Sequence, residues 1–388
     1  MIYMDNAATT RMHEAVAEKM LPYMTEFYGN PSSLYGFSEE SRKAVRAARE
    51  IIASSLNCKP EEICFTNGGS ESDNWALKGV AEYFGKGHII TTQIEHHAVL
   101  HTAKYLEKRG FSVTYLPVDE AGLVNPADVE KAIRPDTILI SVMFANNEIG
   151  TIEPIADIGK IARQNGILFH TDAVQAYAQI PIDLSDMPVD LLSASGHKFN
   201  GPKGTGFLFV RKGTKVENLI HGGGQERGMR AGTENVPGIV GLGEAARLAE
   251  KSLKDKMEKE VRLRNHMMAR IEKEIPYAFL NGPRENRLPG NLNFSFRFIE
   301  GEGLLLYLDM MGVCASSGSA CSAGSAGASH VLTAIGRDSL LAQGSVRLSI
   351  GSDNTLSEAD EVVDILKGAV EKLREMSPLY SDFIKEEL

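Results

Sequence analysis

The sequence has only four cysteines, and it lacks an uninterrupted apolar run of the ~18 residues that a membrane-spanning helix needs. None of the cysteines has the close C-x-x-C spacing of a structural zinc site, and so few in a chain of 388 residues argue against a disulfide framework. The N-terminus shows no basic stretch followed by an apolar run, as a secretory signal would. We therefore expect free thiols, a reducing cytoplasmic location and no membrane anchor.

An excess of positive charge is also absent. The chain has 41 Lys and Arg against 51 Asp and Glu, a formal net charge of −10. Because nucleic acids are bound through basic patches that neutralise phosphates, this balance argues against direct nucleic-acid binding as the main activity. The hydrophobic content of 43% is enough for a substantial core. At ~150 residues per domain, we expect one large domain and one smaller domain.

Short β-type runs alternate with helical patterns through the first two thirds of the chain. Runs such as residues 138–140 are too apolar to have a solvated face, which is typical of a sheet covered on both sides. Because parallel strands need long crossovers, the alternation predicts an α/β domain with a mostly parallel central sheet. The predicted strands are residues 63–66, 88–92, 111–116, 137–144, 167–171, 190–194 and 206–210. The predicted helices are residues 71–84, 97–108, 126–133 and 155–165.

A long helix is predicted over residues 236–274, as a connection between the two domains. The elements predicted after it indicate a smaller α+β domain. They are strands at residues 291–296, 313–315 and 345–350 and a helix at residues 358–376. Ser357, with Asp360 three residues later, is the predicted N-cap of that last helix.

The predicted domain boundaries follow from this order of elements. We expect a large domain over residues 15–260, and a small domain that combines residues 1–14 with residues 261–388 because the N-terminal arm returns to it. Residues 377–388 are expected to form a loosely held tail.

Two charged side chains stand directly after apolar strand-like runs. Asp172 follows the run at residues 167–171, and Lys198 ends an S-G-H-K segment after the next run. A lysine there can bond covalently to an aldehyde cofactor, and a carboxylate can keep a pyridine nitrogen protonated, which is the known arrangement around pyridoxal phosphate. Either residue alone is more simply a surface side chain, but the pair favours such a site. Gln175 could reach the phenolic oxygen of the cofactor.

A glycine turn and a histidine extend this pattern. Gly69 and Ser70 lie in a T-N-G-G-S-E turn between a strand and a helix, where backbone N–H groups and a hydroxyl suit a phosphate. The turn matches neither the P-loop nor the dinucleotide fingerprint, and a plain βα turn is an equally good interpretation. His96 follows another strand, where an imidazole could stack on a cofactor ring and relay protons. Taken alone, it is more simply a structural histidine at a helix start.

Cys321 differs from the other cysteines in its surroundings. It lies in a run of tiny residues, A-S-S-G-S-A-C-S-A-G, with little to pack against. Cys58, Cys64 and Cys314 lie in or beside predicted elements and fit inert structural thiols. We therefore expect Cys321 to be a mobile, exposed thiol, as a sulfur relay requires.

Arg347 alternates with apolar residues on a predicted strand. Its spacing alone favours a surface arginine on that strand. The functional interpretation is a clamp on an amino-acid carboxylate, because a guanidinium binds carboxylates through two parallel hydrogen bonds.

Taken together, these segments resemble the NifS/IscS group of cysteine desulfurases, in the class-V aminotransferase family of fold type I pyridoxal-phosphate enzymes. The resemblance extends over nearly the whole chain, and its motifs occur in the same order. The matching segments are residues 3–10, 29–33, 65–74, 95–96, 146–150, 170–175, 195–198, 221–233 and 317–321. The fold implied is a fold type I transferase, with a large domain around a mostly parallel sheet and a smaller α+β domain.

The resemblance implies roles for residues around the ring of pyridoxal 5'-phosphate. Lys198 would hold the cofactor covalently and act as a catalytic base. Asp172 would pair with the pyridinium nitrogen and Gln175 with the phenolic oxygen. His96 would stack on the ring and take part in catalysis. Cys321 would be the catalytic thiol that carries the persulfide.

Other residues are implied to bind the phosphate and the substrate. The phosphate ligands would be Gly69, Ser70, Ser195 and His197. Thr233 would reach the phosphate of a neighbouring subunit, which implies a homodimer with shared sites. Asn146 and Arg347 would orient the cofactor and the substrate carboxylate.

The implied activity is the conversion of L-cysteine to L-alanine by a sulfurtransferase that loads the sulfur on Cys321. The implied acceptors are an iron–sulfur scaffold protein or a tRNA-thiolation protein. No intrinsic metal is expected, and Cys321 would at most be a transient iron–sulfur ligand shared with a scaffold. Two alternatives remain open. One is a different fold type I enzyme, such as a selenocysteine lyase or an aminotransferase, and the other is an inactive platform in a sulfur-transfer complex.

Overall fold

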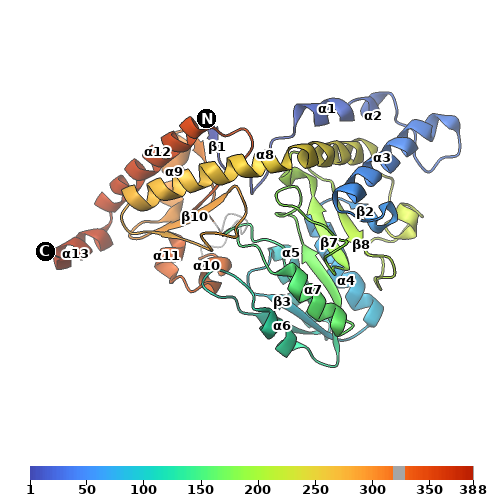
Figure 1. The fold of residues 1–388 in the computed structure, drawn as a ribbon, viewed down its shortest axis with the longest axis horizontal. Helices are drawn as coiled ribbons and strands as arrows, with labels where there is room; N and C mark the ends of the chain where they lie inside the picture. The colour runs from blue at the N-terminus through green and yellow to red at the C-terminus, as the bar shows by residue number, and fades with distance from the viewer. Residues whose placement is uncertain (318–327, 388) are drawn as a thin grey trace.

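The computed structural model describes residues 1–317 and 328–387, which form two unequal lobes joined by one long helix (Figure 1). We call the part around the largest sheet the large lobe, and the part around the three-stranded sheet the small lobe. Helix α8 (Val236–Glu274) runs across both, as Figure 1 shows, and both chain ends lie with the small lobe.

Within the described residues, the largest sheet has seven strands in the order β2-β8-β7-β6-β5-β3-β4. Strands β3 to β7 pair in parallel, whereas β8 is antiparallel to both β2 and β7. The bounds are β2 (Ile63–Thr66), β3 (His88–Thr92), β4 (Ser112–Leu116), β5 (Thr137–Ser141), β6 (Leu168–Asp172), β7 (Leu191–Ser195) and β8 (Gly206–Val210). The predicted fold class, α/β with a mostly parallel sheet, is confirmed. Only residues 196–205 join β7 to β8, too short a segment for a parallel crossover.

Alternating side chains on these strands supply two hydrophobic cores, one on each face of the sheet. Ile63 and Phe65 of β2 face one core, and Cys64 between them faces the other. The same alternation occurs on β8, where Phe207 and Leu208 belong to opposite cores. Because both faces are covered, the central strands have no solvated face, which explains apolar runs such as residues 138–140 in β5.

Helices on both faces complete the large lobe. One face is covered by α4 (Gly69–Phe84) and α5 (His97–Glu107). The other face is covered by α3 (Glu39–Ser55), α7 (Ile155–Gln164) and the first part of α8. The remaining helices of this lobe are α1 (Glu14–Met20), α2 (Pro22–Thr25) and α6 (Pro126–Ala132). Helices α1, α2 and α3 were not predicted from the sequence.

The small lobe is built on an antiparallel sheet in the order β12-β10-β9. Its strands are β9 (Ala278–Leu280), β10 (Asn291–Phe296) and β12 (Ser345–Ser349). The N-terminal arm reaches this lobe, where β1 (Ile2–Tyr3) pairs in parallel with β11 (Val313–Cys314). The helices are α9 (Gly301–Met310), α10 (His330–Ala334), α11 (Ser339–Gln343), α12 (Leu356–Glu375) and α13 (Pro378–Glu387).

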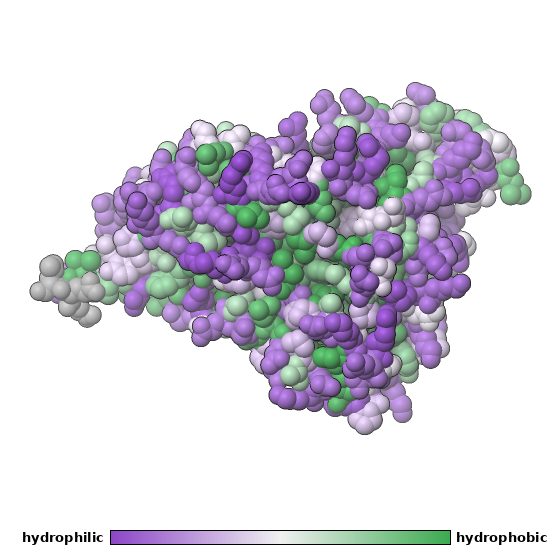
Figure 2. All heavy atoms as spheres, viewed as in Figure 1, coloured by the Kyte–Doolittle hydropathy of each residue, from purple (hydrophilic) through white to green (hydrophobic). Residues whose placement is uncertain are grey.

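Helix α8 contributes to the cores of both lobes. Val236 and Leu242 near its start pack in the large lobe, while Leu263 and Met267 pack in the core of the small lobe. The helix was predicted over these residues and is observed over Val236–Glu274. Among the described residues, no helix combines the length and apolar character needed to cross a bilayer. On the face seen in Figure 2, hydrophilic residues cover most of the surface and hydrophobic residues appear in smaller groups.

The expectation of a loose C-terminal tail is wrong for the described residues. Residues 378–387 form helix α13, and aromatic rings hold it against the small lobe. Phe383 lies 5.4 Å from the ring of Tyr277 and 4.8 Å from the ring of Phe298. Aromatic pairs at such distances add to the stability from buried area alone, and the sequence does not show where the partner rings lie.

The predicted N-cap of α12 is also wrong. The helix begins at Leu356, and Thr355 is its N-cap, with Oγ1 accepting the Glu358 N–H at 3.2 Å. Glu358 in turn accepts the Thr355 N–H at 2.9 Å, which completes a capping box. Both Ser357 and Thr355 precede an acidic residue by three positions, so the pattern alone fits either start.

We predict that Thr355→Ala will lower the free energy of unfolding by about 1 kcal/mol, the usual cost of losing an N-cap hydroxyl. Ser357→Ala is the matched control and should cost less, because Ser357 is exposed in the first turn. Chemical denaturation of the two variants beside the parent chain measures the difference. A larger loss for Ser357→Ala would contradict the observed cap.

Candidate active site

A cavity of about 290 Å³ opens at the ends of strands β6 and β7, beside the starts of helices α4 and α5. Ligand sites of α/β folds occur at the carboxyl ends of their strands. The structure brings most of the predicted site residues to this cavity. They are Gly69, Ser70, His96, Asp172, Gln175, Ser195, His197 and Lys198.

Lys198 lies at the end of the short 3₁₀ segment that follows β7. Its Nζ donates to the carbonyl oxygens of Ala7 at 2.6 Å and Ala8 at 2.8 Å, both on the N-terminal arm. Its own carbonyl accepts a hydrogen bond from Gln179 Nε2 at 2.9 Å. The amine is therefore held over the cavity by the arm, while its backbone is fixed from behind.

Asp172 is the last residue of β6, and its carboxylate is buried. Oδ1 accepts the Val174 N–H at 2.9 Å. Burial raises the pKa of Asp172 to about 6, although this hydrogen bond and the charge of Lys198 act in the opposite direction. A desolvated carboxylate of this kind is stabilised by a cationic group brought into the cavity. Gln175 lies in the turn that follows, with Nε2 donating to the Ala7 carbonyl at 2.9 Å.

His96 is the N-cap of α5, and this fixes its tautomer. Its Nδ1 accepts the Ala98 N–H at 3.1 Å, so the neutral ring carries its proton on Nε2. Burial, followed by the nearby charge of Lys198, lowers the pKa of His96 to about 4. The imidazole is therefore neutral near pH 7. It can stack on a planar ligand and can donate a proton from Nε2.

The start of α4 forms one end of the cavity. Gly68 has φ +139°, in a region that favours glycine, and a Cβ on Gly69 would lie 2.6 Å from Val174 Cγ2. Only glycines let the backbone pass so close to the β6 turn. Ser70 and Ser195 line the same end. Exposed N–H groups at the start of a long helix, with hydroxyls beside them, suit a phosphate.

The cavity therefore fits pyridoxal phosphate. A buried carboxylate and a helix N-terminus can bind the ring nitrogen and the phosphate, and Lys198 lies in the same cavity. A model of the aminotransferase class-V family matches residues 2–362 of the chain. The chain belongs to the class-V aminotransferase family.

Individual relatives also support placing the chain in the class-V aminotransferase family. The protein named cysteine desulfurase IscS of Clostridium botulinum (strain Hall) is 56% identical over 389 residues, which cover 99% of this chain and 98% of that protein. The solved structure of a NifS-like protein is 42% identical with a TM-score of 0.90, covering 96% of this chain and 100% of that one. A structure titled SspA in complex with cysteine is 41% identical with a TM-score of 0.82, over 92% and 100% of the chains. The predicted resemblance is confirmed.

Arg347 is buried on β12, with 3% of its side chain exposed. The interpretation of Arg347 as a surface arginine is therefore wrong. One terminal nitrogen lies 3.0 Å from Asp5 Oδ1, and the other donates to the Asn147 carbonyl at 3.1 Å. Asn147 lines the cavity. The guanidinium thus already holds one carboxylate directly behind the cavity wall.

Two other predicted residues, Asn146 and Thr233, do not line the cavity. Asn146 is fully buried, and its amide bonds Ile94, Glu148 and Ile149 of the surrounding turn. Thr233 is exposed in the segment before α8. Cys321 lies outside the described residues. The cavity is lined by Asn147, the residue next to Asn146, and the role that the resemblance implies for Asn146 stays a prediction.

Asp73 is a cavity residue that the sequence analysis missed. It lies on α4 and is 1% exposed, and burial raises its pKa, with the charge of Asp172 acting in the same direction. His170 Nε2 lies 3.6 Å from Asp73 Oδ1, but burial lowers the pKa of His170, so the ring is neutral. The only available signal in the sequence was its position in the predicted helix directly after the glycine turn.

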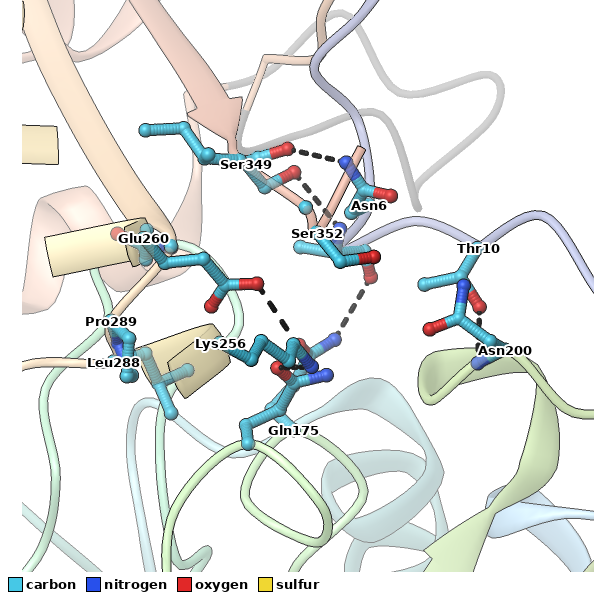
Figure 3. Close-up of a pocket in the computed structure, with 16 residues that line it drawn as sticks. Asn6, Thr10, Gln175, Asn200, Lys256, Glu260, Leu288, Pro289, Ser349 and Ser352 are labelled. Atoms are coloured by element: carbon cyan, nitrogen blue, oxygen red, sulfur yellow. Dashed lines mark hydrogen bonds and ion pairs between the residues drawn. The ribbon is translucent and has the colours of Figure 1, made fainter. Parts of the chain in front are cut away.

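A smaller pocket lies behind the cavity and shares Ala7 and Gln175 with it (Figure 3). Lys256 and Glu260 of α8 point toward each other there, with their charged atoms 4.0 Å apart. Lys256 Nζ donates to Gln179 Oε1 at 2.6 Å, and Gln179 bonds the Lys198 carbonyl. The pocket therefore connects α8 to the backbone of Lys198.

We predict that Glu260→Gln will stabilise the protein more at pH 8 than at pH 4. Burial raises the pKa of Glu260 from 4.5 to about 7, although Lys256 opposes this. The folded chain therefore binds more protons than the unfolded chain in that window, and the contribution of Glu260 to stability falls as pH rises through it. A glutamine at this position does not titrate, so the variant does not lose this stability as the pH rises. Thermal unfolding at both pH values measures the effect, with the exposed Glu258→Gln as control. An equal shift at both pH values would contradict it.

Proposed function

We propose that the chain is a pyridoxal-phosphate-dependent cysteine desulfurase that converts L-cysteine to L-alanine and carries the sulfur as a persulfide on Cys321. The observation that carries this proposal is the placement of Lys198 and the buried Asp172 in one cavity with the N-terminus of α4. A relative named cysteine desulfurase IscS at 56% identity supports the choice of reaction. So does the similarity to a structure titled as a complex with cysteine.

The proposed cofactor contacts are those that the family resemblance implies, and the residues that would make them line the cavity. Asp172 would pair with the ring nitrogen, Gln175 would contact the phenolic oxygen, and His96 would stack on the ring. The phosphate would be bound by Gly69, Ser70, Ser195 and His197. When bound, pyridoxal phosphate withdraws electrons from the substrate Cα.

Lys198 and His96 are the residues that move protons in this proposal. The ε-amine of Lys198 is held on the arm carbonyls within the cavity and takes the proton from the substrate Cα. The neutral His96 presents an N–H at Nε2 and can exchange a proton with the thiol or with the developing methyl group. Because burial keeps this imidazole uncharged, it adds no positive charge beside Lys198.

The sulfur step balances without an external oxidant. The thiolate of Cys321 attacks the substrate sulfur, an S–S bond forms, and the S–Cβ bond breaks. The electron pair of the broken bond remains on the carbon fragment, which takes up a proton to become the methyl group of alanine. Cys58 and Cys64 are poor candidates for this role, because burial raises the pKa of each thiol to about 12.

Further parts of the proposal concern the substrate, the assembly and the acceptor. Arg347 would bind the substrate carboxylate, with Asn146 fixing the turn that carries the cavity residue Asn147. Thr233 would complete the phosphate site of a second copy in a homodimer. The acceptor would be an iron–sulfur scaffold protein or another sulfur acceptor. The large domain would comprise residues 15–260 and the small one residues 1–14 and 261–388.

The test is to incubate the full chain, loaded with pyridoxal phosphate, with sulfur-labelled cysteine and to measure the mass of each cysteine-containing peptide. One extra sulfur on the Cys321 peptide, with stoichiometric alanine, is expected. The peptides of Cys58, Cys64 and Cys314 are internal controls and should stay unlabelled. Full turnover by Cys321→Ser would contradict the relay and favour another reaction on this fold. A colourless chain that cannot take up the cofactor would favour an inactive platform.

A further inference from the structure

Asp73 has no part in the proposed reaction, yet it lies in the same cavity as His96 and Asp172. Each of these three residues has a ligand atom within 4.8 Å of a ligand atom on the other two. They come from three separate elements, namely helix α4, the N-cap of α5 and the end of β6. The folded scaffold therefore fixes their mutual placement, rather than a single loop.

The donor atoms of this trio are suited to a metal. Nδ1 of His96 is used in the helix cap, so Nε2 is the nitrogen available to a ligand in the cavity. Asp73 Oδ1 is buried and has no hydrogen-bond partner among the described residues. The ring nitrogens of the neighbouring His170 have other partners, because the hydroxyls of Ser141 and Ser193 lie at them.

Two buried carboxyls, those of Asp73 and Asp172, lie beside each other here, and Lys198 is the one lysine among the described residues that line the cavity. A buried carboxylate that is not matched by a cation is costly, and a metal ion would relieve that cost.

We infer that the chain without its cofactor binds one divalent transition-metal ion, of the Zn²⁺, Co²⁺ or Fe²⁺ class, through Asp73, His96 and Asp172. One imidazole and two carboxylates are typical ligands for these ions, and the cavity leaves room for water in the open positions. Mg²⁺ and Ca²⁺ are disfavoured, because they prefer more oxygen ligands than this site offers.

The ion and the cofactor exclude each other at this site. Asp172 and His96 are also the residues proposed to contact the cofactor ring, so one molecule cannot hold both ligands. Competition multiplies the apparent dissociation constant of pyridoxal phosphate by one plus the ratio of free ion to its own dissociation constant. Free Zn²⁺ at ten times that constant should therefore weaken cofactor binding about elevenfold. Cofactor loading of the newly folded chain would then depend on the free metal concentration.

A second group of histidines is the rival metal site. The rings of His97 and His101 lie 4.9 Å apart, as do those of His97 and His330. Their ligand atoms do not form a trio within 4.8 Å among the described residues, whereas the cavity trio does. His101 is exposed, so His101→Ala removes this rival with little effect on the fold and serves as the matched control.

The test uses the full chain with its cofactor removed, and with the cofactor restored. Co²⁺ is titrated with detection by its visible absorption, and Zn²⁺ by calorimetry. We expect one ion per chain without cofactor, none at this site with cofactor, and slower pyridoxal-phosphate uptake as Zn²⁺ rises. Asp73→Asn should weaken ion binding at least tenfold, and His101→Ala should not change it.

Several outcomes would overturn the inference. These are equal ion binding with and without cofactor, loss of binding in His101→Ala, or pyridoxal-phosphate uptake that is indifferent to Zn²⁺. The competition experiment needs only the parent chain, so it decides the matter even if Asp73→Asn fails to fold. None of these measurements involves cysteine. The metal site could therefore fail while the desulfurase proposal stands, and the reverse also holds.

Discussion

Lys198→Ala is expected to abolish alanine formation from cysteine, lowering turnover by at least about a thousandfold. Removing a positioned general base alone commonly costs 10²–10⁴ in rate, and this variant also loses the covalent link to the cofactor. Lys198 is the one lysine among the described residues that line the cavity, so no other lysine there is placed to replace it. Alanine release under saturating cysteine measures the effect.

The matched control for that variant is Lys203→Ala, which removes an exposed lysine five positions away. It should keep normal turnover and normal cofactor absorption. The Lys198→Ala chain should still bind pyridoxal phosphate through the phosphate and ring contacts, but borohydride reduction should not attach the cofactor to the chain, as it should in the parent. Turnover within tenfold of the parent chain would contradict the assignment of Lys198.

Arg347→Ala is expected to raise the Michaelis constant for cysteine at least about 30-fold. Removing the buried partner of a carboxylate commonly costs about 2–5 kcal/mol, and each 1.4 kcal/mol is a factor of ten. The guanidinium is almost fully buried, and its Nε has no hydrogen-bond partner among the described residues. The guanidinium therefore still has N–H donors for a second carboxylate beside that of Asp5. Initial rates over a range of cysteine concentrations give the constant.

The Asp5→Asn variant distinguishes a role of Arg347 in substrate binding from a purely structural role. Asp5 bonds Arg347 and also accepts the Ser316 hydroxyl at 2.9 Å, so its loss should lower thermal stability. It leaves the guanidinium in place, however, and should not raise the Michaelis constant. If Arg347 only anchors the N-terminal arm, both variants should lose stability and neither should change cysteine binding. That result would remove Arg347 from the substrate site.

Much of the large lobe could be predicted from the sequence because its strands are short, apolar and regularly spaced. Strands β2, β3 and β8 were predicted with the observed bounds. The direction of β8 could not be predicted, since a strand pattern is the same in either direction. Helix α3 was missed although it packs against α8, because its charged residues outnumber the apolar ones that mark its buried side.

Residues of the candidate site could be predicted where the chemistry needs a rare combination of residue types. They were harder to predict where only burial in the folded chain reveals their role. Lys198 and Asp172 drew attention because each follows an apolar strand. Asp73 did not, since only the packing of α4 against the sheet shows that its carboxyl is buried. Arg347 was ambiguous for the same reason. Its strand reads as half exposed, but the N-terminal arm covers it, a contact between residues distant in sequence.

The length of α8 fixes the position and rotation of one lobe relative to the other. Its 39 residues belong to a single helix, and its two ends are anchored in different cores. Since each helical residue adds ~1.5 Å of rise and ~100° of rotation, one insertion near Lys256 would turn the small lobe by about a quarter of a circle. Arg347 would then leave the cavity wall while Lys198 stayed in place. Point substitutions on the surface of this helix should be tolerated, but changes in its residue count should not.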